Sequence, residues 1–208
     1  MIPVKILAIR YLANASAALC DALGVPRGTP SLGLITTDCD DATYIALDAA
    51  TKAADVEVVY GRSFYAGAAN ASTPNAGEVI GILAGSTPGA VRSGMEAAAA
   101  ALARLGFEDI QGVPCLAHTV SSVGSFLSKE AGVALGSALA YLIAPPLEGM
   151  YAMDAALKAA DVSLCKLYTP PTETNFGGGL LSGTRSACEA ACAAFRQAVA
   201  QVAAAPLG

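Results

Sequence analysis

A nine-residue stretch occurs twice in this chain. Residues 48–56 read DAATKAADV and residues 154–162 read DAALKAADV. The two stretches are 154 − 48 = 106 positions apart, about half of the 208 residues. Solenoid and propeller repeats have periods of roughly 20–50 residues, so this longer period indicates two copies of a whole small domain. The sequence therefore predicts a tandem duplication with pseudo-twofold symmetry, and such units readily build rings.

The composition indicates that the chain does not work alone. Its hydrophobic fraction is 54% and its charged fraction 14%, against about 25% charged residues in an average soluble domain. Since large exposed apolar surfaces usually mark interfaces, we expect an obligate oligomer. No stretch of about 18 apolar residues runs without Gly, Pro or a charge, and no signal peptide is recognisable, so we expect a cytoplasmic protein without a membrane partner.

Charge and cysteine content exclude further classes. The net charge is −5 and no basic run exists, so nucleic acid is not expected as a partner. With one histidine in the chain and no metal-ligand spacing, no metal or cofactor is expected either. We expect reduced, mostly buried thiols for the scattered cysteines, which are Cys20, Cys39, Cys115, Cys165, Cys188 and Cys192.

Each half predicts the order strand, helix, strand, helix, strand, strand, helix. In the first half we expect strands at 4–10, 31–37, 56–60 and 78–84, and helices at 13–23, 40–54 and 88–106. In the second half we expect strands at 114–120, 137–144, 162–168 and 179–183, and helices at 122–129 and 147–160. Asp40 and Asp41 are expected to cap the 40–54 helix. The pattern predicts an α+β fold with helices on one face of a mixed sheet, in domains 1–108 and 109–208.

One loop is longer than a connection requires. Residues 61–77 are rich in Gly, Ala, Asn, Ser and Pro, and loops above about 12–15 residues are usually functional or disordered. The corresponding loop of the second half is shorter.

These segments resemble a known family. The LGLI of residues 32–35, the repeated stretch with the EVV that follows it, and the Ala-rich helix resemble the bacterial microcompartment shell domain. Residues 43–46, 56–67, 140–148 and 171–176 resemble more narrowly the tandem-domain shell proteins of ethanolamine-utilisation compartments. The resemblance implies a circularly permuted domain in each half and a structural, non-catalytic role.

The resemblance also implies partners and sites. It implies a homotrimer that tiles with other shell proteins, a gated central pore, and small pores that bind ethanolamine; cobalamin is left open as a partner. The pore loop would include Arg62, Ser63, Phe64, Tyr65, Gly67 and Asn70. The ethanolamine site would combine carboxylates for the ammonium group with an aromatic ring and a hydroxyl, from Asp40, Asp41, Glu78, Phe107 and Thr174.

Simpler interpretations stay open for these residues. Asp41 could serve simply to cap a helix, and Glu78 could serve simply to keep the start of a strand soluble. Phe107 could be a core residue and nothing more. Lys52 and Lys158, each three residues before an aspartate, fit either a tile edge or a helix-face ion pair.

Other functions also stay open. The chain could be a trimeric metabolite-sensing regulatory protein, or a shell protein of another amino-alcohol or diol compartment. An enzyme would need Cys115 with His118, or the carboxylates as acid and base. No nucleophile motif or phosphate loop supports catalysis, and His118 is expected in a core.

Overall fold

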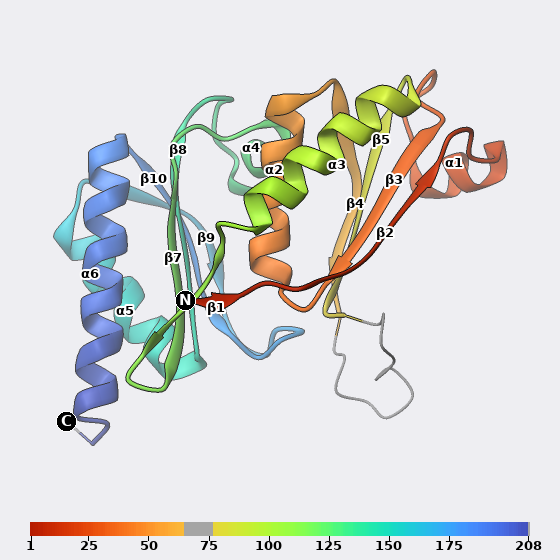
Figure 1. Cartoon of the computed structure of the whole chain (residues 1–208). Helices are drawn as coiled ribbons and strands as arrows, with labels where there is room; N and C mark the ends of the chain where they lie inside the picture. The colour runs from red at the N-terminus through yellow and green to blue at the C-terminus, as the bar shows by residue number, and fades with distance from the viewer. Residues whose placement is uncertain (65–76, 208) are drawn as a thin grey trace. The chain divides into compact units, whose positions relative to one another are not determined.

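The computed structural model describes residues 1–64 and 77–207, which form two compact units (Figure 1). The N-terminal unit contains Pro3–Leu105 and the short segment Gly124–Leu127. The C-terminal unit contains Met1–Ile2, Gly106–Val123 and the chain from Ser128 onwards. Each unit therefore includes a short segment whose neighbours in the sequence belong to the other unit.

The N-terminal unit is a four-stranded sheet with helices α2 and α3 on one face. In spatial order the strands are β2 (Ile6–Leu12), β3 (Ser31–Thr37), β5 (Val79–Gly85) and β4 (Val56–Ser63). The helices are α1 (Ala17–Leu23), α2 (Asp40–Ala53) and α3 (Pro88–Leu102). Helices α2 and α3 pack against each other and against the sheet, whereas α1 contains no buried residue (Figure 1).

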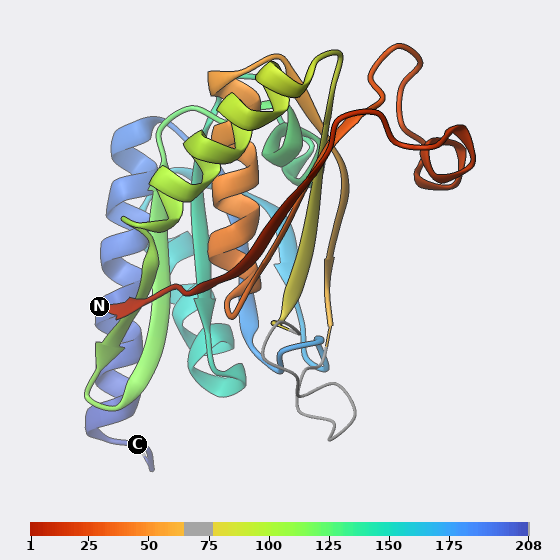
Figure 2. The same cartoon turned by 45° about the vertical axis from the view of Figure 1, so that its right-hand side comes forward.

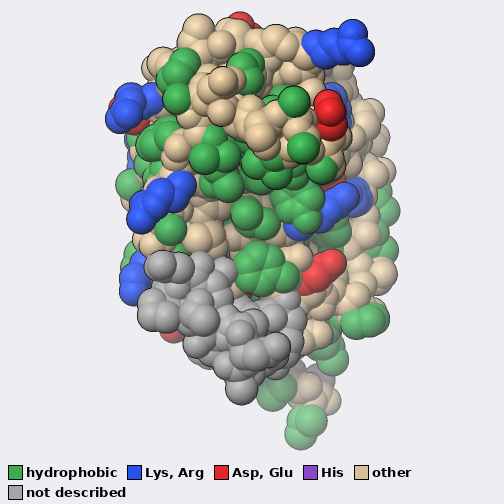
Figure 3. Space-filling model, turned by 90° about the vertical axis from the view of Figure 1, so that its right-hand side faces the viewer, with side chains coloured by type: hydrophobic (Ala, Val, Ile, Leu, Met, Phe, Trp, Pro, Cys, Tyr) green, Lys and Arg blue, Asp and Glu red, His purple; other side chains and the backbone are tan. Residues whose placement is uncertain are grey.

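The opposite face of this sheet is apolar as well. Leu32, Ile82 and Ala84 form a small buried cluster there, and Leu34 and Ile80 are partly buried against it. Figure 3 shows hydrophobic side chains gathered over this side of the N-terminal unit. The apolar surplus in the composition thus remains in part at the surface of the single chain.

The C-terminal unit repeats this plan with a longer sheet (Figure 2). In spatial order its strands are β1 (Ile2–Pro3), β6 (Gly106–Ile110), β7 (Val113–Val120), β8 (Ala138–Ala144), β10 (Gly177–Gly183) and β9 (Val162–Tyr168). Its helices are α5 (Pro146–Ala159) and α6 (Arg185–Ala204), while α4 (Ser125–Ala131) crosses the division between the units. Helices α5 and α6 pack together and cover one face of the sheet.

The neighbouring strands whose register is described, from β2–β3 to β9–β10, run antiparallel. The crossovers β3–α2–β4 and β8–α5–β9 do bring back strands of the same direction. However, β5 lies between β3 and β4, and β10 lies between β8 and β9. Each strand in these pairs therefore meets an antiparallel neighbour.

The chain forms two units of one plan, as a duplication predicts, but one hairpin was missed. The expected helix to 106 ends at Leu102, and β6 then pairs with β7. The turn residues Gln111 and Gly112 have φ of 55° and 87°. Positive φ at both central positions is the requirement of a type I′ turn, so this Gln-Gly pair was the available signal.

The three buried thiols fill the core of the C-terminal unit, and the other three cysteines are partly exposed. Cys115, Cys188 and Cys192 are buried in a cluster with Met153 and Phe195, and the six cysteines are free. This agrees with reduced thiols that act as small apolar side chains. Among the described residues, no helix has both the length and the apolar character that crossing a bilayer requires.

A buried carboxylate joins the two parts of the N-terminal unit. Asp48, on α2, is fully buried. Its side chain accepts hydrogen bonds from the backbone N–H groups of Gly124 and Leu127, both at 2.8 Å, and pairs with Lys52 at 3.1 Å. The backbone N–H of Ser125 donates to the Thr51 hydroxyl at 3.1 Å. Asp48 therefore holds the start of α4 against α2.

The repeated lysines make helix-face ion pairs in both copies. Lys158 pairs with Asp154 at 2.6 Å, as Lys52 pairs with Asp48. In each case the partner is the aspartate four residues earlier. Unlike the Asp48 side chain, which is 0% exposed, that of Asp154 is 65% exposed.

We predict that Asp48→Ala lowers the free energy of unfolding by about 3–5 kcal/mol, because Lys52 and two backbone N–H groups lose their shared acceptor. Urea denaturation followed by circular dichroism measures the change. Glu189→Ala is the matched control, since Glu189 makes an exposed i,i+4 pair with Arg185, and its loss is expected to cost about 0.5 kcal/mol or less. Equal effects of the two variants would contradict this role of Asp48.

Candidate functional site

Four carboxylates gather where β3 ends, α2 begins and β5 begins. They belong to Asp38, Asp40, Asp41 and Glu78. Asp40 and Asp41 are each only 8% exposed. Asp40 accepts a hydrogen bond from the backbone N–H of Asp41 at 2.9 Å, and Asp38 accepts one from the backbone N–H of Lys5 at 2.7 Å. We call these four residues the acidic group.

Backbone hydrogen bonds fix the acidic group in place. The N–H of Glu78 donates to the carbonyl of Thr37 at 2.8 Å, and the N–H of Phe64 donates to the carbonyl of Glu78 at 3.0 Å. The N–H of Cys39 donates to the Thr37 hydroxyl at 3.1 Å. Glu78 is thereby held beside the loop that leads into α2.

The cap of α2 differs from the one expected. Cys39 is the N-cap and makes no side-chain capping bond, while Asp40 and Asp41 lie in the first turn. Negative charge is favourable there because the N-terminus of a helix is the positive end of its dipole. The Thr37 hydroxyl bonds the backbone of Cys39 and the Thr43 hydroxyl, and so fixes the chain just before the helix.

The charges of the acidic group act on one another. Burial raises the pKa of Glu78, and the negative charges of Asp40 and Asp38 raise it further. Burial also raises the pKa of the Cys39 thiol; a backbone hydrogen bond partly offsets this, and the charges of Asp41, Asp40 and Glu78 add to the increase. The structure therefore brings together the three acidic residues of the predicted ethanolamine site.

This arrangement suits a small organic cation. Carboxylates form their strongest hydrogen bonds with charged donors such as an ammonium group. Within residues 1–64 and 77–207, no cluster of three or more His, Cys, Asp or Glu has the geometry to hold a metal ion. An added positive charge would relieve the repulsion that raises the pKa of Glu78.

The other two predicted site residues belong to the C-terminal unit. Phe107, on β6, is half-buried and meets Phe176 edge to face, with ring centroids 5.5 Å apart and an interplanar angle of 65°. Thr174 is half-buried in the turn before Phe176, where Asn175 has a φ of 60°. Phe176 was not among the predicted site residues, although it lies within a segment that carried the family resemblance.

The predicted pore loop begins later than expected. Arg62 and Ser63 belong to β4, because the hairpin register with β5 continues through Ser63 opposite Val79. The Ser63 and Tyr44 hydroxyls are 2.6 Å apart, and Phe64 follows, half-buried. The predicted pore residues Tyr65, Gly67 and Asn70 lie outside the described residues.

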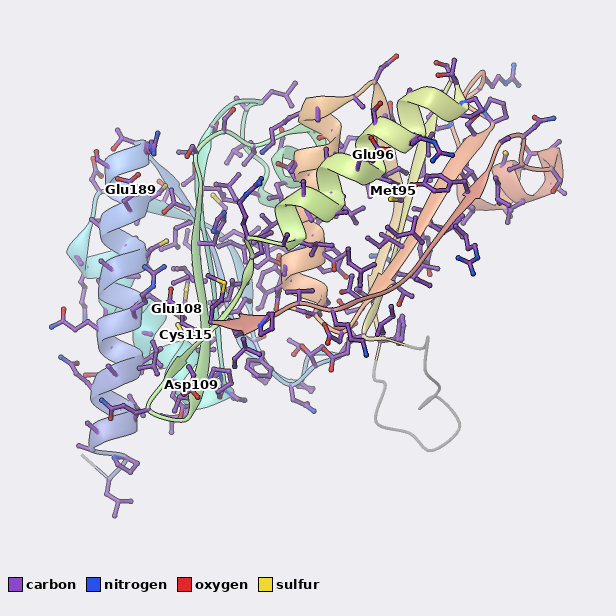
Figure 4. The ribbon with its side chains drawn as sticks, viewed as in Figure 1. Met95, Glu96, Glu108, Asp109, Cys115 and Glu189 are labelled. Atoms are coloured by element: carbon purple, nitrogen blue, oxygen red, sulfur yellow. The ribbon has the colours of Figure 1, made fainter. Side chains whose placement is uncertain are left out.

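Cys115 and His118 do not form a catalytic pair. They are three positions apart on β7, and alternation along a strand directs their side chains to opposite faces. Glu108 on β6 lies opposite Cys115 (Figure 4). Its side chain pairs with Arg196 at 2.8 Å. Burial raises the pKa of Cys115 to about 12 although Arg196 lowers it, so the thiol stays protonated at neutral pH.

We predict that Glu78→Gln makes the protein more stable relative to the wild type as pH rises. A carboxyl whose pKa is raised by folding contributes stability below its unfolded pKa, about 4.3 for glutamate, and loses it as pH rises through the folded value. The variant lacks this loss, so the difference in melting temperature grows from pH 4 to pH 7.

The control for this prediction is Glu57→Gln, because Glu57 is exposed on β4. It is expected to leave the melting temperature nearly unchanged over the same range. A constant difference between Glu78→Gln and the wild type would contradict the burial of Glu78 beside other charges.

Comparison with known proteins gives matches along the whole chain. Residues 31–112 match the BMC domain family. The bacterial microcompartment shell protein EutL of Clostridium perfringens is 55% identical, covering 100% of this chain and 98% of that protein. The protein of the same name from Escherichia coli is 48% identical, covering 100% and 96%. The crystal structure of ethanolamine utilization protein EutL from Leptotrichia buccalis superposes with a TM-score of 0.96 at 53% identity, covering 100% and 97%.

Proposed function

Because the chain belongs to the EutL-type family of bacterial microcompartment shell proteins, we propose that it forms porous tiles of an ethanolamine-utilisation shell. The chain is a structural shell protein and not an enzyme, and its place is the shell of a microcompartment. The observation that carries the proposal is the 55% identity along the full chain. The tile, its pores and its ligand are the parts that go beyond family membership.

The proposed tile is a homotrimer. Three chains with two shell domains each give a six-domain ring with a hexagonal outline, which packs edge to edge with other shell proteins. The duplicated domain and the apolar face of the N-terminal unit support this assembly. A shell tile also accounts for the low charged fraction of 14%, since much of the surface is covered in the sheet.

We expect the purified protein to form hexagonal sheets at high concentration. Electron microscopy detects the sheets, and light scattering at low concentration counts the subunits. A discrete trimer that never tiles would contradict the shell role and favour the metabolite-sensing alternative, because a sensor has no need of lateral assembly. A sheet built from a ring of another size would contradict the trimer.

The proposed ligand of the acidic group is ethanolamine in its protonated form. Asp40, Asp41 and Glu78 supply buried or half-buried acceptors for its ammonium group. Phe107 and Thr174 stay predictions as further members of that site. The gated central pore and a role for cobalamin also stay predictions from the family resemblance.

We predict that Asp41→Ala and Glu78→Gln each weaken ethanolamine binding about tenfold or more, since a hydrogen bond to a charged group contributes roughly 1.5–3 kcal/mol. Isothermal titration calorimetry with ethanolamine measures the change. Glu57→Gln serves as the control, because it removes one negative charge from an exposed position of the same unit. Unchanged affinity in both test variants would exclude the acidic group as the site.

A further inference from the structure

Two buried hydroxyls adjoin the acidic group. Thr37, the last residue of β3, and Thr43, near the start of α2, are both 0% exposed, and their hydroxyl oxygens are 2.7 Å apart. Burying a hydroxyl costs free energy unless it makes hydrogen bonds. The hydrogen bonds of this pair therefore show what it stabilises.

The hydroxyl pair holds the segment that joins β3 to α2. The Thr43 hydroxyl donates to the carbonyl of Cys39 at 2.8 Å, and the Thr37 hydroxyl lies 2.9 Å from the same oxygen. The backbone N–H of Cys39 donates to the Thr37 hydroxyl at 3.1 Å. Asp40 and Asp41 follow Cys39 directly. The two hydroxyls therefore fix the backbone that carries these carboxylates.

The backbone of Thr37 holds the other side of the acidic group. Its carbonyl accepts the hydrogen bond from the N–H of Glu78 at 2.8 Å. Gly77 makes this approach possible, because it has a φ of 64° and a Cβ atom on it would collide with the carbonyl of Thr37 and the hydroxyl of Thr36. Thr37 thus holds Glu78 through its carbonyl and the start of α2 through its hydroxyl.

The second copy of the domain lacks the hydroxyl pair. Thr37 lies opposite the first residue of β5, as Ala144 lies opposite Gly177, the first residue of β10, so Ala144 is the equivalent of Thr37. The fourth residue of the helix is Thr43 in α2 and Gly149 in α5. A Cβ atom on Gly149 would lie 2.7 Å from the carbonyl oxygen of Gly177, so α5 has no room for a threonine there.

The second copy lacks the carboxylates as well. Helix α5 begins with Pro146 and Leu147, whereas α2 begins with two aspartates. Phe176 precedes β10, whereas a glutamate precedes β5. The connection from strand to helix is Pro145 alone, against residues 38–39 in the first copy. The hydroxyls and the carboxylates are absent together, so the fold of the domain does not itself require a buried threonine at this position.

We propose that Thr37 is the positioning residue of the ethanolamine site, which it holds in its binding arrangement before the ligand arrives. The role rests on the proposed function, since ethanolamine at the acidic group is part of it. Carboxylates that lie close together repel one another, and on an unrestrained loop they would move apart. Because Thr37 fixes both sides of the acidic group, the free energy of ordering the carboxylates is not lost on binding. Thr37 acts through these carboxylates and is not itself a ligand group.

The test compares threonine variants by isothermal titration calorimetry with ethanolamine. Thr37→Val keeps the shape of the side chain but removes its hydroxyl, and it is expected to weaken binding about tenfold. Thr37→Ser retains the hydroxyl and is expected to bind within about threefold of the wild type. Thr51→Val is the matched control, because the Thr51 hydroxyl donates to the carbonyl of Asp48 at 2.8 Å, away from the start of α2. Its loss is expected to lower the melting temperature without changing the affinity.

A second readout does not need the ligand. The difference in melting temperature between Glu78→Gln and its parent chain grows with pH, in part because the charges of Asp40 and Asp38 act on Glu78. In the Thr37→Val background Asp40 is no longer held beside Glu78, so we expect a smaller growth of this difference. In the Thr51→Val background the growth is expected to equal that of the wild type.

The outcomes separate the role of Thr37 from the identity of the ligand. Wild-type affinity in Thr37→Val, equal losses in Thr37→Val and Thr51→Val, or weak binding by Thr37→Ser would each overturn the positioning role. A wild-type chain that does not bind ethanolamine would contradict the proposed ligand. The pH series then decides, because a smaller growth in the Thr37→Val background supports the role of Thr37 and an unchanged growth overturns it.

A further variant covers the case in which Thr37→Val does not fold. Thr43→Val removes the other hydroxyl of the pair and leaves the bonds between Thr37 and Cys39 in place. It is expected to weaken ethanolamine binding about fivefold. Wild-type affinity in this variant would overturn the proposal.

Discussion

The carboxylate of Asp48 is the interaction on which the duplicated architecture depends. This carboxylate is fully buried. It accepts hydrogen bonds from two backbone N–H groups at the start of α4, and it also forms an ion pair with Lys52. A buried charge is tolerated only when its hydrogen bonds are satisfied, so the helix segment and α2 are held in one arrangement. Through that bond the segment Gly124–Leu127, more than a hundred residues into the chain, becomes part of the N-terminal unit.

The carboxylates of the acidic group lie in an environment that contrasts with that of Asp48. At Asp48 the negative charge meets donors, whereas at Glu78 it meets further negative charges and a partly desolvated position, which raises the pKa. Such a site costs stability in the absence of a cation and gains binding energy in its presence. Its position at the end of β3, at the first turn of α2 and beside the chain that leaves β4 places it on rigid elements of the shell domain.

Local patterns predicted most elements but not the contacts between distant ones. The strand Ser31–Thr37, the helix that starts at Asp40 and the strand Val162–Tyr168 follow directly from short-range patterns of apolar residues. The direction of neighbouring strands did not follow from these patterns, because β5 comes to lie between β3 and β4 only through long-range contacts in the folded chain. Nor does sequence tell Asp48 from Asp154, since both stand in the same DAA motif and only contacts with residues about 76 positions away bury the first. The three carboxylates were identified from the resemblance, whereas the mutual effect of their charges required the structure.

A duplicated chain with an apolar surplus at its surface has a simple physical completion, which is association with other copies of itself. Electron cryomicroscopy of the assembled protein tests this most directly, because it shows which surfaces of neighbouring copies meet. The account predicts rings of three chains that pack edge to edge in a sheet. Discrete rings without lateral contacts would contradict it.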